Sequence, residues 1–261
     1  QEISIDENYM FTIKQKVINN TDKNISVSPV AKISRTDTPE TQGFFILHEG
    51  PIGVIDDILE ELDYKDLKKN IGPIEYKTKG GWMGITDKYW LATLIPDQNS
   101  NVVVRYQFYT KNNKEKYQVD YKGGIIEIPS KKSATIQNLL YAGAKEIKLL
   151  DKYEKQYSIP RLDFAIDFGW YYFLTKPFLY ILIFFQNIFG NFGVSIILLT
   201  LLIKLVFFPL ANKSYTAMQK MKELQPQLMR LKEMYKNDKV KLNQEMMAPY
   251  KREKVNPAAG C

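Results

Sequence analysis

The stretch Phe192–Leu210, FGVSIILLTLLIKLVFFPL, decides how this chain is organised. As an α-helix its 19 residues span roughly 28 Å, which matches the hydrocarbon core of a lipid bilayer. Lys204 is the only charged residue inside it, and Thr200 lies one turn earlier on the same helical face. We predict a transmembrane helix over this stretch, with Pro209 close to its end, where a kink costs little.

Two interpretations of Lys204 stand side by side. A charge near the middle of a bilayer costs about 2.5–3.5 kcal/mol on insertion scales, so its presence needs a reason. In the first interpretation the lysine side chain extends its ammonium group to the headgroups and has no further role. In the second, Lys204 and Thr200 line a polar cavity in one leaflet, where the positive charge attracts acidic segments of a passing polypeptide. The hydroxyl is a weak signal, because Ser and Thr readily bond within their own helix.

Most of the excess positive charge follows this helix. Residues 211–254 hold 11 Lys and Arg against 5 Asp and Glu, whereas the whole chain holds 36 and 29. The position of these charges directly after an apolar span fits the positive-inside rule better than it fits binding to a nucleic acid. We therefore predict that the chain is cytoplasmic from Ala211 onward, and we expect no specific nucleic-acid sequence as a partner.

The basic segment also has a helical pattern. Apolar residues recur at three- and four-residue spacing over 215–234 and over 240–250, with a break at 236–238. This pattern predicts two helices folded back on each other. Six of the eight methionines fall within 218–247, and they form either the seam between the helices or an adaptable docking surface.

The segment before the predicted span, Phe164–Gly190, is apolar and rich in aromatic residues, but it holds Lys176-Pro177 in its middle. Only about 12 apolar residues follow this break, fewer than the roughly 20 that a span needs. We predict an amphipathic helix in the headgroup zone, within residues 158–191. The alternative is a kinked transmembrane helix over Phe168–Phe189, which would make the preceding domain cytoplasmic.

Residues 1–157 have the composition of a soluble domain rich in β-strands. Clusters such as NNTDKN, PDQNSN and TKNNK separate short runs that alternate apolar and polar residues, which favours an antiparallel sandwich. Residues 55–69 fit either one short helix or a polar loop, and residues 133–157 are predicted as a helical stalk. The expected strands are Tyr9–Ile18, Ile25–Ile33, Tyr89–Ile95, Val102–Tyr109, Tyr117–Tyr121 and Ile125–Ile128.

The sequence offers little to a catalytic or metal site. Its single cysteine, Cys261, excludes an internal disulfide framework and a cysteine-rich metal site, and its single histidine, His48, is expected in an ordinary loop. A P-loop, a Cys/His pair and a histidine-based triad are all absent from the sequence. We expect no enzyme activity, no cofactor and no metal. Because the chain begins at Gln1, we expect a fragment that lacks an upstream anchoring or export segment.

Several extended motifs carry a family resemblance. The stretch SIILLTLLIKLVFFPL is similar to the family span, in which the pattern T-x-x-x-R/K-x-x-x-x-PL follows SII, and YTAMQKMKELQPQLMRLKE and QEMMAPYKREKVNPAAGC follow it in the family's order. GWMGITDKYWLATLIP (Gly81–Pro96) and LYAGAKEIKLLD (Leu140–Asp151) look like signatures of the family's periplasmic domain. Over essentially its whole length, the chain resembles the YidC family of bacterial membrane-protein insertases.

This resemblance implies a mixed fold: an antiparallel β-supersandwich in the periplasm over 1–157, an interfacial helix over 158–191, a transmembrane helix over 192–210, and a cytoplasmic helical hairpin over 211–261, whose end begins a further membrane segment. It implies a membrane insertase and folding chaperone of the bacterial inner membrane. Lys204 aligns with the positive residue of the family's hydrophilic groove, and Thr200 with the polar residue one turn before it.

The expected partners are nascent membrane-protein clients, the ribosome, the Sec translocon and anionic lipids. They are expected to dock on basic residues of the hairpin: Lys213, Lys220, Lys222, Arg230 and Lys232.

The chain departs from the family pattern at two positions. The family usually has arginine at the position of Lys204, and lysine offers a point charge without a fixed fork of donors. Pro249 replaces the usual leucine of MMALYK, and a proline inside a helix costs about 3 kcal/mol. We predict that the hairpin ends early or kinks there. The family also continues into three more transmembrane helices, so this chain is expected to supply one wall of the groove.

Two other functions stay open. The family's sandwich resembles sugar-binding supersandwiches, so the chain fits a membrane-anchored periplasmic carbohydrate-binding or sugar-active protein, although one histidine disfavours acid–base catalysis of the mutarotase type. A transporter predicts several spans around a midplane site, whereas only Phe192–Leu210 is firmly predicted to span.

Overall fold

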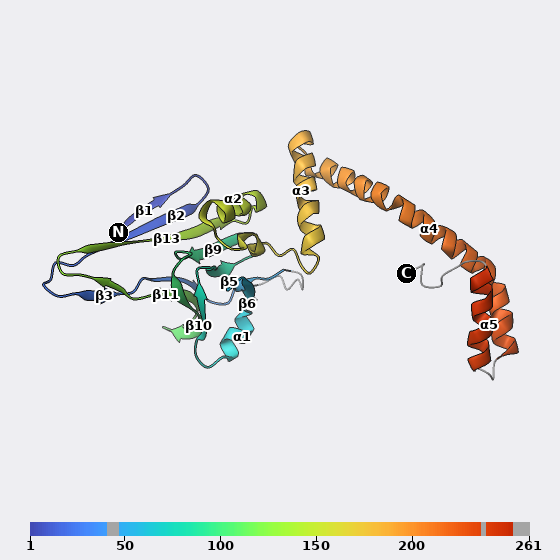
Figure 1. Cartoon of the computed structure of the whole chain (residues 1–261), viewed down its shortest axis with the longest axis horizontal. Helices are drawn as coiled ribbons and strands as arrows, with labels where there is room; N and C mark the ends of the chain where they lie inside the picture. Colours follow the sequence, from blue (N-terminus) through green and yellow to red (C-terminus); the bar gives the residue numbers. More distant parts are fainter. Residues whose placement is uncertain (41–46, 236–238, 253–261) are drawn as a thin grey trace. The chain divides into compact units, whose positions relative to one another are not determined.

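The computed structural model describes residues 1–40, 47–235 and 239–252. The chain divides into two compact units, Gln1–Tyr172 and a second unit that begins at Phe173. The first unit is built mainly from antiparallel β-strands, and the second is helical (Figure 1).

Two larger antiparallel sheets and one small one form the first unit. Adjacent strands are joined in several places by tight turns, such as Asn112-Asn113, where both residues have positive φ and fit a two-residue hairpin. The seven-stranded sheet has the order β1 (Glu2–Ile5), β2 (Met10–Ile18), β13 (Ser133–Ala144), β9 (Trp90–Ile95), β8 (Trp82–Thr86), β5 (Gly50–Ile55) and β6 (Ile58–Glu61). The four-stranded sheet has the order β4 (Val30–Thr36), β11 (Lys114–Gly123), β10 (Asn101–Lys111) and β7 (Ile74–Lys79), and β12 (Ile126–Ile128) pairs with β3 (Ile25–Val27).

The seven-stranded sheet is the middle layer of this unit. One of its faces carries Trp82 and packs against the helix α2 (Ile147–Tyr157) and the 3-10 helix η1 (Leu162–Ala165). The other face carries Met83 and packs against the four-stranded sheet. Because both faces are covered, strand β8 is buried at every position and lacks the alternation of a half-exposed strand. The N-terminal unit is therefore an antiparallel sandwich with helices on one side, as expected.

The structure corrects two predictions for this unit. Ser133–Ala144 is a strand in the interior of the large sheet, and only Ile147–Tyr157 of the predicted stalk is helical. That helix buries Leu150 and Tyr153 against the sheet. Residues 55–69 are neither one helix nor a loop: a tight turn at Asp56-Asp57 leads into β6, and the short helix α1 (Tyr64–Lys69) follows.

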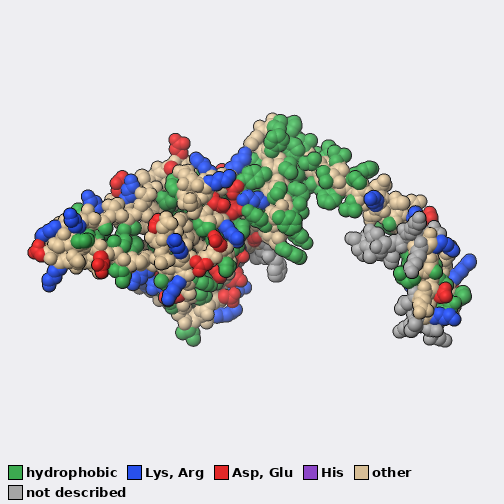
Figure 2. All heavy atoms as spheres, viewed as in Figure 1, with side chains coloured by type: hydrophobic (Ala, Val, Ile, Leu, Met, Phe, Trp, Pro, Cys, Tyr) green, Lys and Arg blue, Asp and Glu red, His purple; other side chains and the backbone are tan. Residues whose placement is uncertain are grey.

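The second unit consists of helices α3 (Tyr172–Phe189), α4 (Phe192–Met234) and α5 (Lys239–Arg252). Helices α3 and α4 are each long and apolar enough to cross a membrane, with mean hydropathies of 1.3 and 2.5 in their most apolar windows. Figure 2 shows hydrophobic side chains over much of both helices, and few of these residues are buried. Their apolar surface is thus available to lipid.

The predicted hairpin is confirmed, because α5 packs against the C-terminal part of α4 (Figure 1). The predicted break at 236–238 lies outside the described residues. The predicted early end at Pro249 is not found, because Pro249 lies inside α5, which continues to Arg252. Pro177 likewise lies inside α3, which continues on both sides of it. The predicted span and the first hairpin helix form one continuous helix of 43 residues that contains Pro209 and Pro226.

Candidate functional site

The N-terminal half of α4 carries the first candidate site. Asn191 caps the helix, because its side-chain oxygen accepts from the backbone N–H groups of Gly193 at 2.8 Å and Val194 at 3.3 Å. The hydroxyl of Ser195 donates to the Asn191 carbonyl at 2.8 Å, and that of Thr200 donates to the Ile196 carbonyl at 2.8 Å. Both hydroxyl protons are therefore used within the helix.

Thr200 and Lys204 are exposed on α4, as are Leu201, Leu205 and Phe208 around them. A hydroxyl that donates one bond still has lone pairs free to accept. Within the described residues Lys204 has no ion-pair partner. The site thus offers an ammonium donor and a hydroxyl acceptor, one helical turn apart, in an otherwise apolar segment.

The basic hairpin is the second candidate site. Leu224 and Leu228 of α4 are buried against α5, and Met221, Met246 and Tyr250 pack around them. Met218, Met229, Met234 and Met247 are exposed, so the methionine stripe supplies both a seam and an outer surface. Lys213, Lys220, Lys222, Arg230 and Lys232 are all exposed and make no ion pair with any described residue.

A shallow hollow of about 360 Å³ lies between the two hairpin helices. Arg230 and Gln227 line it from α4, and Glu245 and Arg252 line it from α5. The Arg252 guanidinium donates to the Gln227 side chain at 3.0 Å, which ties the two helices together beside the hollow. The hairpin therefore presents a charged surface with apolar methionine side chains nearby.

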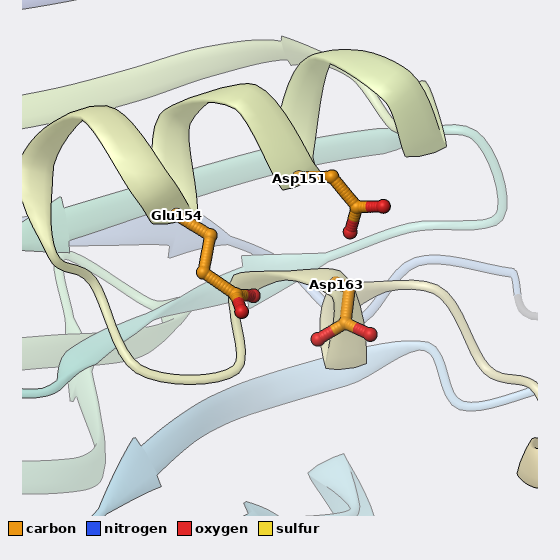
Figure 3. A group of neighbouring side chains, drawn as sticks. All are labelled: Asp151, Glu154 and Asp163. Carbon is orange, nitrogen blue, oxygen red and sulfur yellow. The ribbon is translucent and has the colours of Figure 1, made fainter.

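Sequence reasoning missed a cluster of three carboxyl groups in the first unit. Asp151 and Glu154 project from α2, and Asp163 projects from η1, so that their oxygens lie within 4.8 Å of one another (Figure 3). The first two are three residues apart on one helix face, but the third comes from another element. Only the fold brings Asp163 to them, so spacing along the chain could not reveal the cluster.

The environment of this cluster favours a proton on it. Asp163 is only 2% exposed, and the Tyr172 hydroxyl donates to its side chain. One side-chain oxygen of Glu154 is buried with no hydrogen-bond partner among the described residues. Burial, followed by the nearby Asp163, raises the pKa of Glu154. Oxygen ligands of this kind also suit a hard divalent cation, and these three residues are the ones in the described chain that could hold it.

An ion pair holds the turn between β8 and β9, which consists of Asp87-Lys88-Tyr89-Trp90. Arg35 of β4 forms a two-pronged ion pair with Asp87 and also donates to the Tyr64 hydroxyl at 2.9 Å. Lys145 donates to Thr86 at 3.0 Å, and burial lowers the pKa of Lys145, against the raising effect of Asp167, Asp87 and Glu49. His48 lies in the loop before β5, as expected, with its ring bonded to the Pro51 carbonyl.

An antiparallel sandwich followed by long exposed apolar helices defines an integral membrane protein with a large folded domain outside the bilayer. Family models place it further: residues 1–181 match the YidC periplasmic domain, and residues 184–261 match the 60Kd inner membrane protein family. The chain belongs to the YidC family of inner membrane proteins.

Named relatives agree with this assignment. The chain is 49% identical to the membrane protein insertase YidC of Rickettsia felis and 50% identical to that of Rickettsia rickettsii, each over 99% of this chain and 46% of the relative. It thus spans about half the length of the curated relatives it matches. A solved putative aldose 1-epimerase from Klebsiella pneumoniae has a TM-score of 0.26 at 8% identity, covering 52% of this chain and 43% of its own, and this score supports no inference.

Proposed function

We propose that the chain is part of a membrane-protein insertase and folding chaperone that moves client transmembrane segments into the bacterial inner membrane. The relatives that are about half identical over 99% of this chain are named membrane protein insertase. The observation that carries the proposal is the exposed Lys204 within the apolar half of α4, one turn after Thr200. No covalent bond changes in this activity, so it requires no cofactor.

The proposed mechanism lowers the barrier that a hydrophilic client segment meets in hydrocarbon. Thr200 and Lys204 form one wall of a wet groove, in which polar groups of the client exchange water for protein partners. Lys204 attracts acidic residues of the client segment as a point charge, without the two-pronged geometry of arginine. The opposite wall of the groove comes from helices beyond this chain, so the chain acts as part of a larger protein.

In this proposal the hairpin is cytoplasmic and receives the partners. Its exposed basic residues suit the ribosome, the Sec translocon, acidic parts of nascent clients and anionic lipid headgroups, and its exposed methionines suit varied apolar segments. The docking residues are Lys213, Lys220, Lys222, Arg230 and Lys232.

The proposed orientation follows from charge. The basic segment after α4 marks the cytoplasmic side, so the sandwich unit is periplasmic if α4 alone spans. We assign α3 to the outer interface rather than to a span, because it is less apolar than α4 and contains Lys176-Pro177. A spanning α3 would reverse the position of the sandwich.

The test is made in the full-length protein with Lys204→Arg, Lys204→Gln and Lys204→Glu variants at equal expression. We score insertion of a single-span client that carries an acidic translocated tail. Insertion is expected to fall with glutamine and further with glutamate, and to persist with arginine. Equal insertion by all three variants would contradict the role of the charge.

A matched control distinguishes two explanations of a Lys204 effect: a lysine that must face a groove, and a lysine that needs only to lie at this depth in the bilayer. The double variant Lys204→Gln with Leu202→Lys restores a lysine at nearly the same depth but about 200° around the helix. If Lys204 faces a groove, this variant stays as defective as Lys204→Gln. If a lysine at that depth only needs to reach the headgroups, the double variant regains full insertion.

A further inference from the structure

The turn Asp87-Lys88-Tyr89-Trp90 belongs to a sequence motif that the proposed insertion mechanism leaves without a role. Its two aromatic side chains point into solvent: Tyr89 is 64% exposed and Trp90 is 61% exposed. The ammonium group of Lys88 lies 5.1 Å from the centre of the Tyr89 ring. Large aromatic side chains contribute most to stability when they are buried, so their exposure here calls for a partner.

The turn that carries these side chains is firmly held. The Asp87 side chain is fixed by Arg35, and its backbone N–H donates to the Trp90 carbonyl at 2.9 Å. The Tyr89 carbonyl accepts from the backbone N–H of Lys145 at 2.9 Å. Because the backbone is ordered by these bonds, little entropy is lost when the two rings meet a surface.

A second exposed aromatic pair lies at the same end of the unit. Trp170 is 86% exposed and Tyr171 is 52% exposed, and their rings stack with centroids 4.9 Å apart. Two hydrogen bonds connect the two regions through the loop before β5. The backbone N–H of His48 donates to Asp167 at 3.3 Å, and the backbone N–H of Lys88 donates to the neighbouring Glu49 at 3.2 Å.

We infer that these four residues, Tyr89, Trp90, Trp170 and Tyr171, form an aromatic surface that docks the sandwich unit on the headgroup zone of a lipid bilayer. Tyrosine and tryptophan prefer this zone because each combines an apolar ring with a polar tip. The apolar helix α3 begins at Tyr172, directly after Trp170 and Tyr171 in the chain. A bilayer that holds α3 is therefore close to these two rings. Lys88 adds a cation that can reach anionic headgroups.

This docking requires that the helices enter a bilayer, but it does not depend on insertion of clients. The contact through the turn is separate from the covalent link through Trp170 and Tyr171. Two separate contacts fix the tilt of the sandwich on the membrane, whereas a single covalent link leaves the tilt free. The inference thus concerns how the domain is held, independently of what the membrane helices transport.

The test uses the chain in vesicles of phosphatidylethanolamine and phosphatidylglycerol, with and without lipid brominated near the headgroup end of its acyl chains. The Trp170→Phe variant leaves Trp90 and the fully buried Trp82 as the only tryptophans. We expect brominated lipid to quench the Trp90 emission, and vesicles to protect it from acrylamide in the water. Trp90 emission that brominated lipid leaves unchanged, and that acrylamide quenches, would overturn the inference.

A matched control places a tryptophan elsewhere on the same unit. Ile125 is 75% exposed and follows the Gly123 end of β11. Tyr117, toward the other end of that strand, meets the ring of Tyr64 edge-on, and Tyr64 accepts a hydrogen bond from Arg35, the partner of Asp87. The triple variant Ile125→Trp, Trp90→Phe, Trp170→Phe should show no quenching by brominated lipid. Equal quenching at positions 90 and 125 would mean that the unit lies on the membrane without a preferred face, which would also overturn the inference.

Discussion

The sandwich unit and the membrane helices use apolar side chains in opposite ways. In the first unit, both faces of the large sheet are covered around its central strands, and residues such as Trp82 and Met83 are fully buried within the unit. In α3 and α4 the most apolar windows are 0% and 6% buried. The contrast shows that the first unit buries its apolar side chains against one another, whereas the apolar side chains of α3 and α4 are left for the bilayer to cover.

The largest expected effect is a loss of stability, and one substitution in each unit tests the contrast directly. Leu91→Ala removes a side chain that is 2% exposed, and it should lower the free energy of unfolding of the first unit by about 2–5 kcal/mol. Leu201→Ala removes a side chain that is 52% exposed, and it should change that unfolding by less than about 0.5 kcal/mol.

Both free energies are measured by urea unfolding of the chain in detergent, followed by tryptophan fluorescence. Similar losses for the two variants would contradict the division into one self-contained unit and one that depends on lipid.

The hairpin lies between the two extremes, and a smaller effect is expected there. Leu224→Ala should destabilise the α4–α5 pair by about 2 kcal/mol, at the low end for leucine, because only Leu224 and Leu228 among the described hairpin residues are buried apolar side chains. The readout is faster amide hydrogen exchange in α5. The control Met229→Ala alters an exposed side chain of the same helix and should leave exchange unchanged; acceleration by both variants would argue against a specific seam.

The smallest expected effect is a pH dependence of the first unit. Because the pKa of Glu154 is raised in the folded state, the native protein holds this proton more tightly than the unfolded chain does. Stability should therefore fall as pH rises from the ordinary glutamate pKa through the raised one. Glu154→Gln should flatten this slope in thermal unfolding measured across that range, and the exposed Glu7→Gln should leave it intact. An unchanged slope in Glu154→Gln would place the proton elsewhere.

Local pattern was enough to predict much of the fold. Alternation identified β2 and β10, and uniform apolarity together with length identified the apolar half of α4. It failed at Ser133–Ala144, because the buried Asn138 is polar and the apolar residues Leu139, Leu140 and Tyr141 are consecutive, which hides the period of two in the sequence. It also failed at β6, where the only signal was the Asp56-Asp57 turn.

The candidate sites were predictable to different extents. Lys204 stood out because a charge in an apolar run is rare, and the basic hairpin residues stood out by their number. The carboxyl cluster was hidden, since Asp163 meets Asp151 and Glu154 only after the chain turns back beneath α2. Likewise, the distance along the chain between Trp90 and Trp170 conceals that both lie at one end of the unit.

The continuity of α4 has a mechanical consequence. Pro209 has no N–H to offer the Leu205 carbonyl, so the helix bends easily where its apolar half meets its basic half. About 25 residues of helix lie beyond this proline, and a bend of about 10° would carry Met234 sideways by roughly 6 Å. A load on the end of the hairpin is thus taken up mainly as bending at Pro209, so the segment that carries Lys204 can keep its position while the hairpin moves.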